Sequence, residues 1–340
     1  MTGSSSARTS PAPWDFAAPW GARGYVTQLD GPVHWIEFGA GQDSSHGPGP
    51  DSGQPGPPIV FVHGLGGSHL NWCLVGPQLA AGRRAVALDL HGFGLTPGTR
   101  ATATVQANHR LLDQFVREIT GTPVVLVGNS MGGLISVLQT AAAPDTVAGL
   151  VLIDPALPVP RRRPDRRVAS RFLLYALPGV GELYVSAVQS RLPPQQAVQQ
   201  IIELCFCDPS RADSAMVRAS MALVAERQAA PARDVLARSQ SFLAASRSLM
   251  GVLSRRQRYW AMMAGIGVPV LLIGGNADRL VPAASMHQAR ARNPHWESVM
   301  LAGVGHTPQL EVPDLVIGTM RDWLERQVTP QPQTLAGEER

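Results

Sequence analysis

The chain has 340 residues, 44% of them hydrophobic, which is enough for a substantial core. Its formal charge of +4 is too small to argue for nucleic-acid binding by itself, and no basic helix interleaved with aromatic residues supports such a partner. Three cysteines, Cys73, Cys205 and Cys207, are too sparse for a disulfide framework and are expected to be core or half-buried thiols.

The sequence lacks the motifs that are typical of several classes of protein. No segment approaches 18 uninterrupted apolar residues and no signal peptide is visible, so we expect a cytoplasmic protein without a membrane span. No motif typical of a metal or phosphate site is present, so we expect no metal and no cofactor. Lysine is absent and all 29 basic residues are arginines, which weakens the functional interpretation of any single arginine.

The N-terminal part combines a polar tail with a hairpin. Residues 1–20 are interpreted as a flexible tail. Alternating apolar and polar residues at 25–29 and 33–38 flank Asp30-Gly31, which predicts two antiparallel strands. The stretch 39–57 consists almost entirely of Gly, Pro, Ser, Asp and Gln, and is predicted to be a disordered surface loop.

From residue 59 onward, apolar strands alternate with helical patterns. Strands are predicted at 59–62, 85–89, 124–127 and 147–153, with helical spacing between them. This alternation implies right-handed crossovers and a mostly parallel sheet with helices on both faces. We therefore assign residues 21–155 to the first part of an α/β core.

A purely helical block then interrupts the alternation. Strand signals vanish over residues 156–263, where helices are predicted at 195–206, 213–225 and 234–253. Its position suggests a cap above the carboxyl ends of the strands, where open sheets bind ligands. Strands and helices return over 264–328, the second part of the core, and 329–340 form a C-terminal tail.

The chemistry centres on Gly128-Asn129-Ser130-Met131-Gly132, which lies between a buried strand and a helix. This is the form of a nucleophile elbow, in which a tight turn holds the serine at the edge of the sheet. The two glycines leave room for that turn.

Two partners for Ser130 follow in the order acid, then histidine. Asp278 and His306 each come just after a predicted strand, so both converge on the sheet edge that carries Ser130. A serine hydroxyl needs a base, and the base needs an orienting acid. Asp154, which ends an earlier strand, competes with Asp278 for the acid role. Asp89 is interpreted instead as the residue that shapes a glycine-rich loop.

A second glycine-rich turn, His63-Gly64-Leu65-Gly66-Gly67, follows the strand at 59–62. Serine hydrolases with this elbow place a backbone N–H of such a loop at the developing oxyanion. We therefore expect the N–H groups of Leu65 and Met131 to form an oxyanion hole.

These motifs together resemble the α/β-hydrolase superfamily over most of residues 21–328. The resemblance implies an eight-stranded, mostly parallel sheet with a helical lid. It also implies that Ser130, Asp278 and His306 form the triad, with oxyanion donors at Leu65 and Met131. The serine argues against haloalkane dehalogenases and epoxide hydrolases, which carry an aspartate at that position.

The leading hypothesis is a carboxylic ester hydrolase that acts through an acyl-serine. The elbow is also similar to that of C–C bond hydrolases of the meta-cleavage type and of cofactor-free perhydrolases. Another alternative is a ligand-binding protein on a hydrolase scaffold. The partner is expected to be a small molecule with an apolar acyl or alcohol group, bound on the underside of residues 156–263, and oligomeric state is left open.

The arginine-rich run Arg161–Arg167 invites a membrane-surface or anionic-substrate hypothesis. A solvated hinge in an arginine-biased chain is the favoured explanation of the run, and its role is left open. The apolar residues at 172–177 suggest a lid with a hydrophobic underside.

Overall fold

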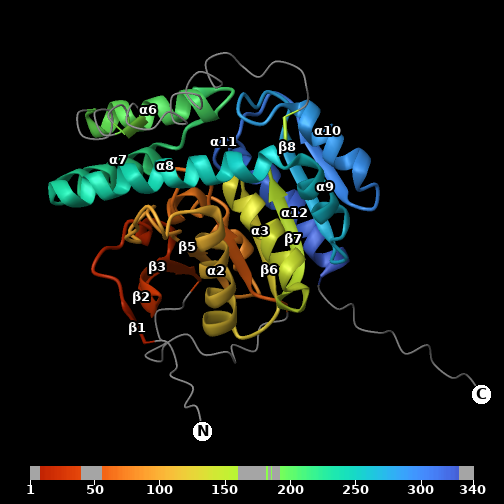
Figure 1. The fold of residues 1–340 in the computed structure, drawn as a ribbon, viewed down its shortest axis with the longest axis horizontal. Coiled ribbons are helices and arrows are strands. Elements are labelled where there is room, and N and C mark those ends of the chain that lie inside the picture. The colour runs from red at the N-terminus through yellow and green to blue at the C-terminus, as the bar shows by residue number, and fades with distance from the viewer. Residues whose placement is uncertain (1–7, 40–55, 160–180, 183–184, 186–191, 329–340) are drawn as a thin grey trace, which may run out of the picture.

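A computed structural model describes residues 8–39, 56–159, 181–182, 185 and 192–328. The parts of the predicted tails at 1–7 and 329–340, most of the predicted loop 39–57, and both the Arg161–Arg167 run and the apolar segment 172–177 lie outside them. Strands and helices alternate over residues 59–153 and 270–327, as the sequence predicted (Figure 1).

The sheet of the described residues has nine strands in the order β1-β2-β3-β5-β4-β6-β7-β8-β9. The first three strands and the β3–β5 pair are antiparallel, and every other neighbouring pair is parallel. The strands are β1 Thr9–Pro11, β2 Ala22–Leu29, β3 Gly31–Phe38, β4 Ile59–Val62, β5 Ala85–Leu88, β6 Val124–Asn129, β7 Val147–Ile153, β8 Val270–Gly275 and β9 Glu297–Leu301.

The ninth strand corrects the prediction for the N-terminus. We expected eight strands and a flexible tail over residues 1–20, but Thr9 to Pro11 pair with Tyr25 to Thr27 at the edge of the sheet. The side chains of Thr9 and Thr27 are hydrogen-bonded at 2.8 Å between their hydroxyl oxygens. A segment of three residues that contains a proline gives no strand signal in the sequence. Its pairing with β2 is therefore visible only in the structure.

The helices of the core cover both faces of the sheet. One face carries α2 Val105–Phe115, which continues as a π-helical turn over Val116–Thr120, together with α3 Met131–Ala142, α9 Arg256–Ala264 and α10 Ala283–Arg292. The other face carries α1 Gly76–Leu79 and α12 Pro313–Gln327. Short helices complete the connections: Ala18–Trp20, His69–Trp72, Pro144–Thr146 and α11 Pro308–Glu311.

Alternation along the central strands explains this two-faced core. In β6, Val124 and Leu126 belong to the buried cluster on one face, whereas Val125 and Val127 belong to the cluster on the other. Successive side chains of a strand point to opposite faces, so a continuous apolar run predicts burial on both.

All elements described between β7 and β8 are helical, as predicted for this part of the chain. The largest are α6 Pro194–Cys205, α7 Ser214–Ala229 and α8 Ala232–Ser254, with a short turn at Pro209–Arg211. We call α6, α7 and α8 the insertion helices. Figure 1 shows them stacked across one end of the sheet. No helix among the described residues is long and apolar enough to cross a membrane.

Candidate active site

Ser130 occupies the turn between β6 and α3 in a backbone conformation that side chains rarely adopt. Its φ is 54° and its ψ is −120°. A Cβ at Gly128 would lie 2.6 Å from the Gly132 carbonyl oxygen, and a Cβ at Gly132 would overlap the Val62 carbonyl oxygen of β4. Both glycines are therefore required by close backbone approach, and the strain at Ser130 is held in place by the surrounding sheet.

The structure pairs His306 with Asp278. His306 Nδ1 lies 2.6 Å from Asp278 Oδ2, and both side chains are buried. The other carboxylate oxygen of Asp278 accepts the backbone N–H groups of Leu280 at 2.6 Å and Val281 at 3.0 Å. These donors fix the position of the carboxylate, which in turn orients the imidazole and leaves its Nε2 for other contacts.

Asp154 is close to this pair but does not contact the histidine. It is fully buried at a positive φ of 39°, and both of its carboxylate oxygens accept the N–H of Gly275, at 3.0 and 3.1 Å. Burial raises the pKa of Asp154 well above its usual range, and the neighbouring Asp278 raises it further. Both effects favour the neutral form of Asp154, and the geometry favours Asp278 over Asp154 as the acid partner of His306.

The loop that carries His306 is fastened to the first insertion helix. The His306 N–H donates to the Cys205 carbonyl at the end of α6, over 2.6 Å. The His306 carbonyl accepts the side-chain amide of Asn129, next to Ser130, at 3.1 Å. A Cβ at Gly305 would overlap the Cys205 carbonyl oxygen, which explains the glycine before His306.

Glu311 was not anticipated from the sequence, although it organises the same loop. Its buried carboxylate accepts the N–H of Gly305 at 2.8 Å and the N–H groups of Cys207 and Asp208 at 3.1 and 3.0 Å. A single glutamate at the end of a short helix carries no motif, so only its three partners identify it. Cys205 and Cys207 are half-buried thiols here, as expected, and burial raises the pKa of Cys205 to about 12.

Two backbone N–H groups near Ser130 have no partner among the described residues. The N–H groups of Leu65 and Met131 donate to no other group in the part of the chain that the structure describes. The loop carrying Leu65 lies against the elbow, because a Cβ at Gly64 would come within 3.0 Å of the Ser130 Cβ. Met131 is the first residue of α3, where helical N–H groups have no partner within the helix.

His63 holds this loop in place as a neutral imidazole. Its Nε2 accepts the N–H of Leu90 at 3.1 Å, so its Nδ1 carries the proton and donates to the Gly64 carbonyl at 2.7 Å. Burial lowers the pKa of His63 to about 4. The sequence marks His63 as the start of the loop, but this bridge joins segments 27 residues apart and is visible only in the structure.

Asp89 shapes the adjacent loops, as predicted. Its buried carboxylate accepts the backbone N–H of His69 at 2.7 Å and that of Leu95 at 2.9 Å. The same carboxylate contacts Nδ1 of His34 and of His69, at 2.8 and 2.9 Å. Burial of Asp89 is offset by these donors, which lower its pKa well below the usual range. Its hydrogen bonds are saturated by protein groups, which favours a structural role over metal binding.

A cavity of about 690 Å³ brings these features together. Ser130, His306 and Leu65 line it from the core, and the insertion helices line it from the opposite side. The hydroxyl of Ser130 and the imidazole of His306 share this cavity without a hydrogen bond between them in this structure. Hydrogen bonds between a nucleophile and its base are often long before substrate binds.

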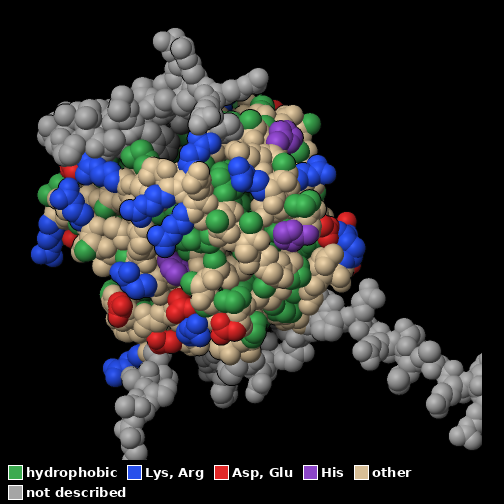
Figure 2. All heavy atoms as spheres, turned by 45° about the vertical axis from the view of Figure 1, so that its right-hand side comes forward, with side chains coloured by type: hydrophobic (Ala, Val, Ile, Leu, Met, Phe, Trp, Pro, Cys, Tyr) green, Lys and Arg blue, Asp and Glu red, His purple; other side chains and the backbone are tan. Residues whose placement is uncertain are grey.

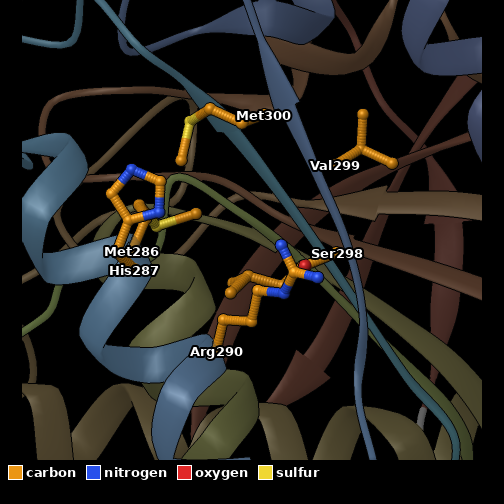
Figure 3. Close-up of a pocket in the computed structure, with 7 residues that line it drawn as sticks. Met286, His287, Arg290, Ser298, Val299 and Met300 are labelled. Carbon is orange, nitrogen blue, oxygen red and sulfur yellow. The ribbon is translucent and has the colours of Figure 1, made fainter. Parts of the chain in front are cut away.

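A second hollow between α10 and β9 is unsuited to catalysis. Its volume is about 40 Å³, and it is lined by Met286, His287 and Arg290 of α10 and by residues around Met300 of β9 (Figure 3). None of the predicted site residues borders it. This space can hold a water molecule or two, but not an organic substrate.

Comparison with known proteins identifies the fold family of this chain. The sequence model of the alpha/beta hydrolase fold family matches residues 57–313. A dihydrolipoyllysine-residue acetyltransferase component of the acetoin cleaving system from Pseudomonas putida is 26% identical over 92% of this chain and 74% of its own length. A 2-hydroxy-6-oxononadienedioate/2-hydroxy-6-oxononatrienedioate hydrolase from Cupriavidus pinatubonensis is 26% identical over 86% of this chain and 91% of its own.

Solved structures share the architecture. The structure of a putative lipase from Acinetobacter baumannii superimposes with a TM-score of 0.70 at 19% identity, and covers 92% of this chain and 94% of that one. At this identity the similarity concerns the fold alone.

The environments of Asp154 and Asp278 predict opposite results for the same substitution. Asp278→Asn should lower kcat/KM roughly 10⁴-fold, because the amide favours the wrong tautomer of His306. Asp154→Asn should stay within about threefold of the wild type, because the amide oxygen can still accept the N–H of Gly275 and His306 is paired with Asp278 instead. Ester hydrolysis and thermal unfolding at pH 7 provide the measurement. A large loss in a folded Asp154→Asn variant, with Asp278→Asn active, would reverse the assignment.

The His63 bridge predicts a loss of stability in acid. The unfolded chain binds a proton at His63 below pH 6.5, whereas the folded chain binds it only near pH 4. Stability from this group is therefore present above pH 6.5 and declines as the pH falls towards 4, by roughly 3 kcal/mol at about 1.4 kcal/mol per pKa unit. Urea unfolding at several pH values checks this.

His63→Gln is the matched variant for that experiment. It should be less stable at every pH, because it replaces a buried bridge, but its free energy of unfolding should depend less steeply on pH between 6.5 and 4. Equal slopes for the variant and the wild type would show that His63 does not titrate as described.

Proposed function

Because this chain belongs to the alpha/beta hydrolase fold family, we propose that it is a serine hydrolase that cleaves carboxylic esters through an acyl-enzyme on Ser130. The observation that carries the proposal is the Asp278–His306 pair, joined at 2.6 Å on the cavity that also holds the strained Ser130. Two unpaired N–H groups beside Ser130 add the means to stabilise an oxyanion.

The proposed first half-reaction forms the acyl-enzyme. His306 Nε2 takes the proton from the Ser130 hydroxyl as its oxygen attacks the ester carbonyl, and Asp278 stabilises the resulting imidazolium. The N–H groups of Leu65 and Met131 bind the oxyanion of the tetrahedral intermediate. His306 then passes its proton to the departing alcohol, which leaves the acyl group bound to Ser130.

The second half-reaction returns the free enzyme. Water enters the cavity, His306 takes one of its protons, and the hydroxide attacks the acyl carbon in the same oxyanion hole. Collapse of this intermediate releases the carboxylic acid, and Ser130 regains its proton from His306. In this proposal the insertion helices act as the cap that encloses the substrate, and the partner is a small molecule.

Hydrolysis of a C–C bond is the second candidate. The relative from Cupriavidus pinatubonensis carries the name of a hydrolase of 2-hydroxy-6-oxo dienoic acids, and it matches along 91% of its length. Here Thr307 follows His306, where C–C hydrolases of this type typically carry an aromatic residue. Rates on aryl esters compared with vinylogous diketones separate the two reactions.

A fluorophosphonate probe tests the nucleophile directly. The folded wild type should be labelled at Ser130, and Ser130→Ala should remain unlabelled because it lacks the attacking oxygen. His306→Ala should be labelled much more slowly, and kcat/KM for an aryl ester should fall at least ~10⁴-fold in each variant. Mass spectrometry of the labelled peptide identifies the residue.

Thr307→Ala serves as the matched control, because it alters the residue next to His306 without removing a proposed catalytic group. It should keep labelling within about threefold of the wild type. An unlabelled but folded wild type would leave only a binding protein on a hydrolase scaffold.

A further inference from the structure

The cavity above Ser130 is mainly apolar. Side chains from the core and from the insertion helices enclose it, including Phe93, Leu157, Val198, Met216, Phe242 and Leu249. Its volume of about 690 Å³ is in the range of sites for small organic ligands. An apolar wall of this extent favours hydrocarbon groups, so any charged residue within it stands out.

Arg227, in the last turn of α7, is such a residue. It lines the cavity, and to the described residues its guanidinium makes one long hydrogen bond, from Nη2 to the Gly92 carbonyl at 3.4 Å. No carboxylate of the described residues lies within ion-pair distance of it. Burial lowers the pKa of Arg227 to about 10, yet the group stays cationic at neutral pH.

Arg238 of α8 also lines the cavity, but its position has a structural explanation. Its guanidinium donates to the Arg227 carbonyl at the end of α7, where helical carbonyls lack partners within the helix. A cation at a helix C-terminus is also favoured by the helix dipole. The charge of Arg238 further lowers the pKa of Arg227, so Arg238 does not compensate that cation.

Arg227 is half-buried at the cavity, and one long hydrogen bond cannot satisfy its five N–H donors. A ligand that brings a carboxylate or phosphate would supply the missing acceptors, because the planar guanidinium binds such groups in a bidentate manner. Arg227 thus has the properties of an anion site for which the described residues supply no counter-ion.

The anion site lies on the oxyanion side of the cavity. Gly92, which accepts from Arg227, belongs to the loop after β5, and Arg227 also lowers the pKa of His63 beneath the Leu65 loop. On the face shown in Figure 2, basic side chains gather in the upper part, and acidic side chains lie mainly lower down. A positive field of this kind attracts anionic substrates.

We propose that Arg227 binds an anionic group, carboxylate or phosphate, on an otherwise apolar ester, and so sets the specificity of the cavity for charged esters. This inference rests on the proposed esterase function. The proposed substrate has an apolar body that fills the cavity and an anionic group that reaches Arg227.

The kinetic test compares two esters of similar length, p-nitrophenyl hexanoate and mono-p-nitrophenyl adipate. In the adipate ester a carboxylate replaces the terminal methyl group of the hexanoate. Arg227→Gln should lower kcat/KM for the adipate ester at least about tenfold, as loss of a charged hydrogen bond does, and leave the hexanoate within about threefold. Arg227→Lys should retain part of the preference. Equal effects on both esters, or no effect on either, would overturn the proposal.

Arg218→Gln is the matched control. Arg218 lies on the same helix, is exposed and does not line the cavity, so the variant changes net charge equally. It should leave the ratio of the two rates unchanged. A loss as large as that of Arg227→Gln would assign the effect to the general field of the protein and overturn the site.

Direct binding separates failure of this site from failure of the esterase function. Calorimetry with the non-hydrolysable N-hexyladipamic acid, the phosphate ester of N-hexyl-6-hydroxyhexanamide and neutral N-hexylhexanamide requires no catalysis. One or both anions should bind the wild type at least about tenfold more tightly than the neutral amide, and Arg227→Gln should abolish the difference. The anion that binds more tightly shows whether the site prefers a carboxylate or a phosphate. Equal binding of all three would refute the anion site even if ester hydrolysis is observed.

Discussion

The turn between β6 and α3 is the constraint on which the rest of the site depends. Ser130 adopts its positive φ only because strand and helix meet without an intervening loop, and Gly132 lets the helix approach the Val62 carbonyl of β4. The parallel register of β4 and β6 sets that approach. The position of the proposed nucleophile is therefore a property of the whole sheet, which over-determines a strained backbone.

Hydrogen bonds connect this turn to the insertion helices. Asn129 holds the carbonyl of His306, whose N–H is held by Cys205 of α6, and Glu311 ties Gly305 to the residues that follow α6. The proposed base is thus clamped between the elbow and the insertion. A displacement of α6 would therefore move His306. Ligand binding in the cavity is in this way linked to the position of the proposed base.

Electrostatic environment divides the buried acids into different roles. Asp278 accepts two N–H groups and contacts an imidazole, whereas Asp154 is buried beside another acid, which raises its pKa. Asp89 is surrounded by four donors, and its pKa is lowered. The residue type is the same in all three, and the groups around each carboxyl group distinguish them.

The sequence by itself determined the alternation of strands and helices, the helical insertion and the strand-to-helix turn at Ser130, because hydrophobic periodicity and glycine positions are local signals. It also supplied Asp278 and His306 as candidates from their places after strands. Only the tertiary structure decided that His306 pairs with Asp278 rather than Asp154, and that Thr9 to Pro11 add a ninth strand. It also decided that Glu311 binds the loop that carries His306 and that Arg227 lines the cavity. These depend on contacts between residues far apart in the chain, and on the donors and dielectric around each charge, which no local pattern encodes.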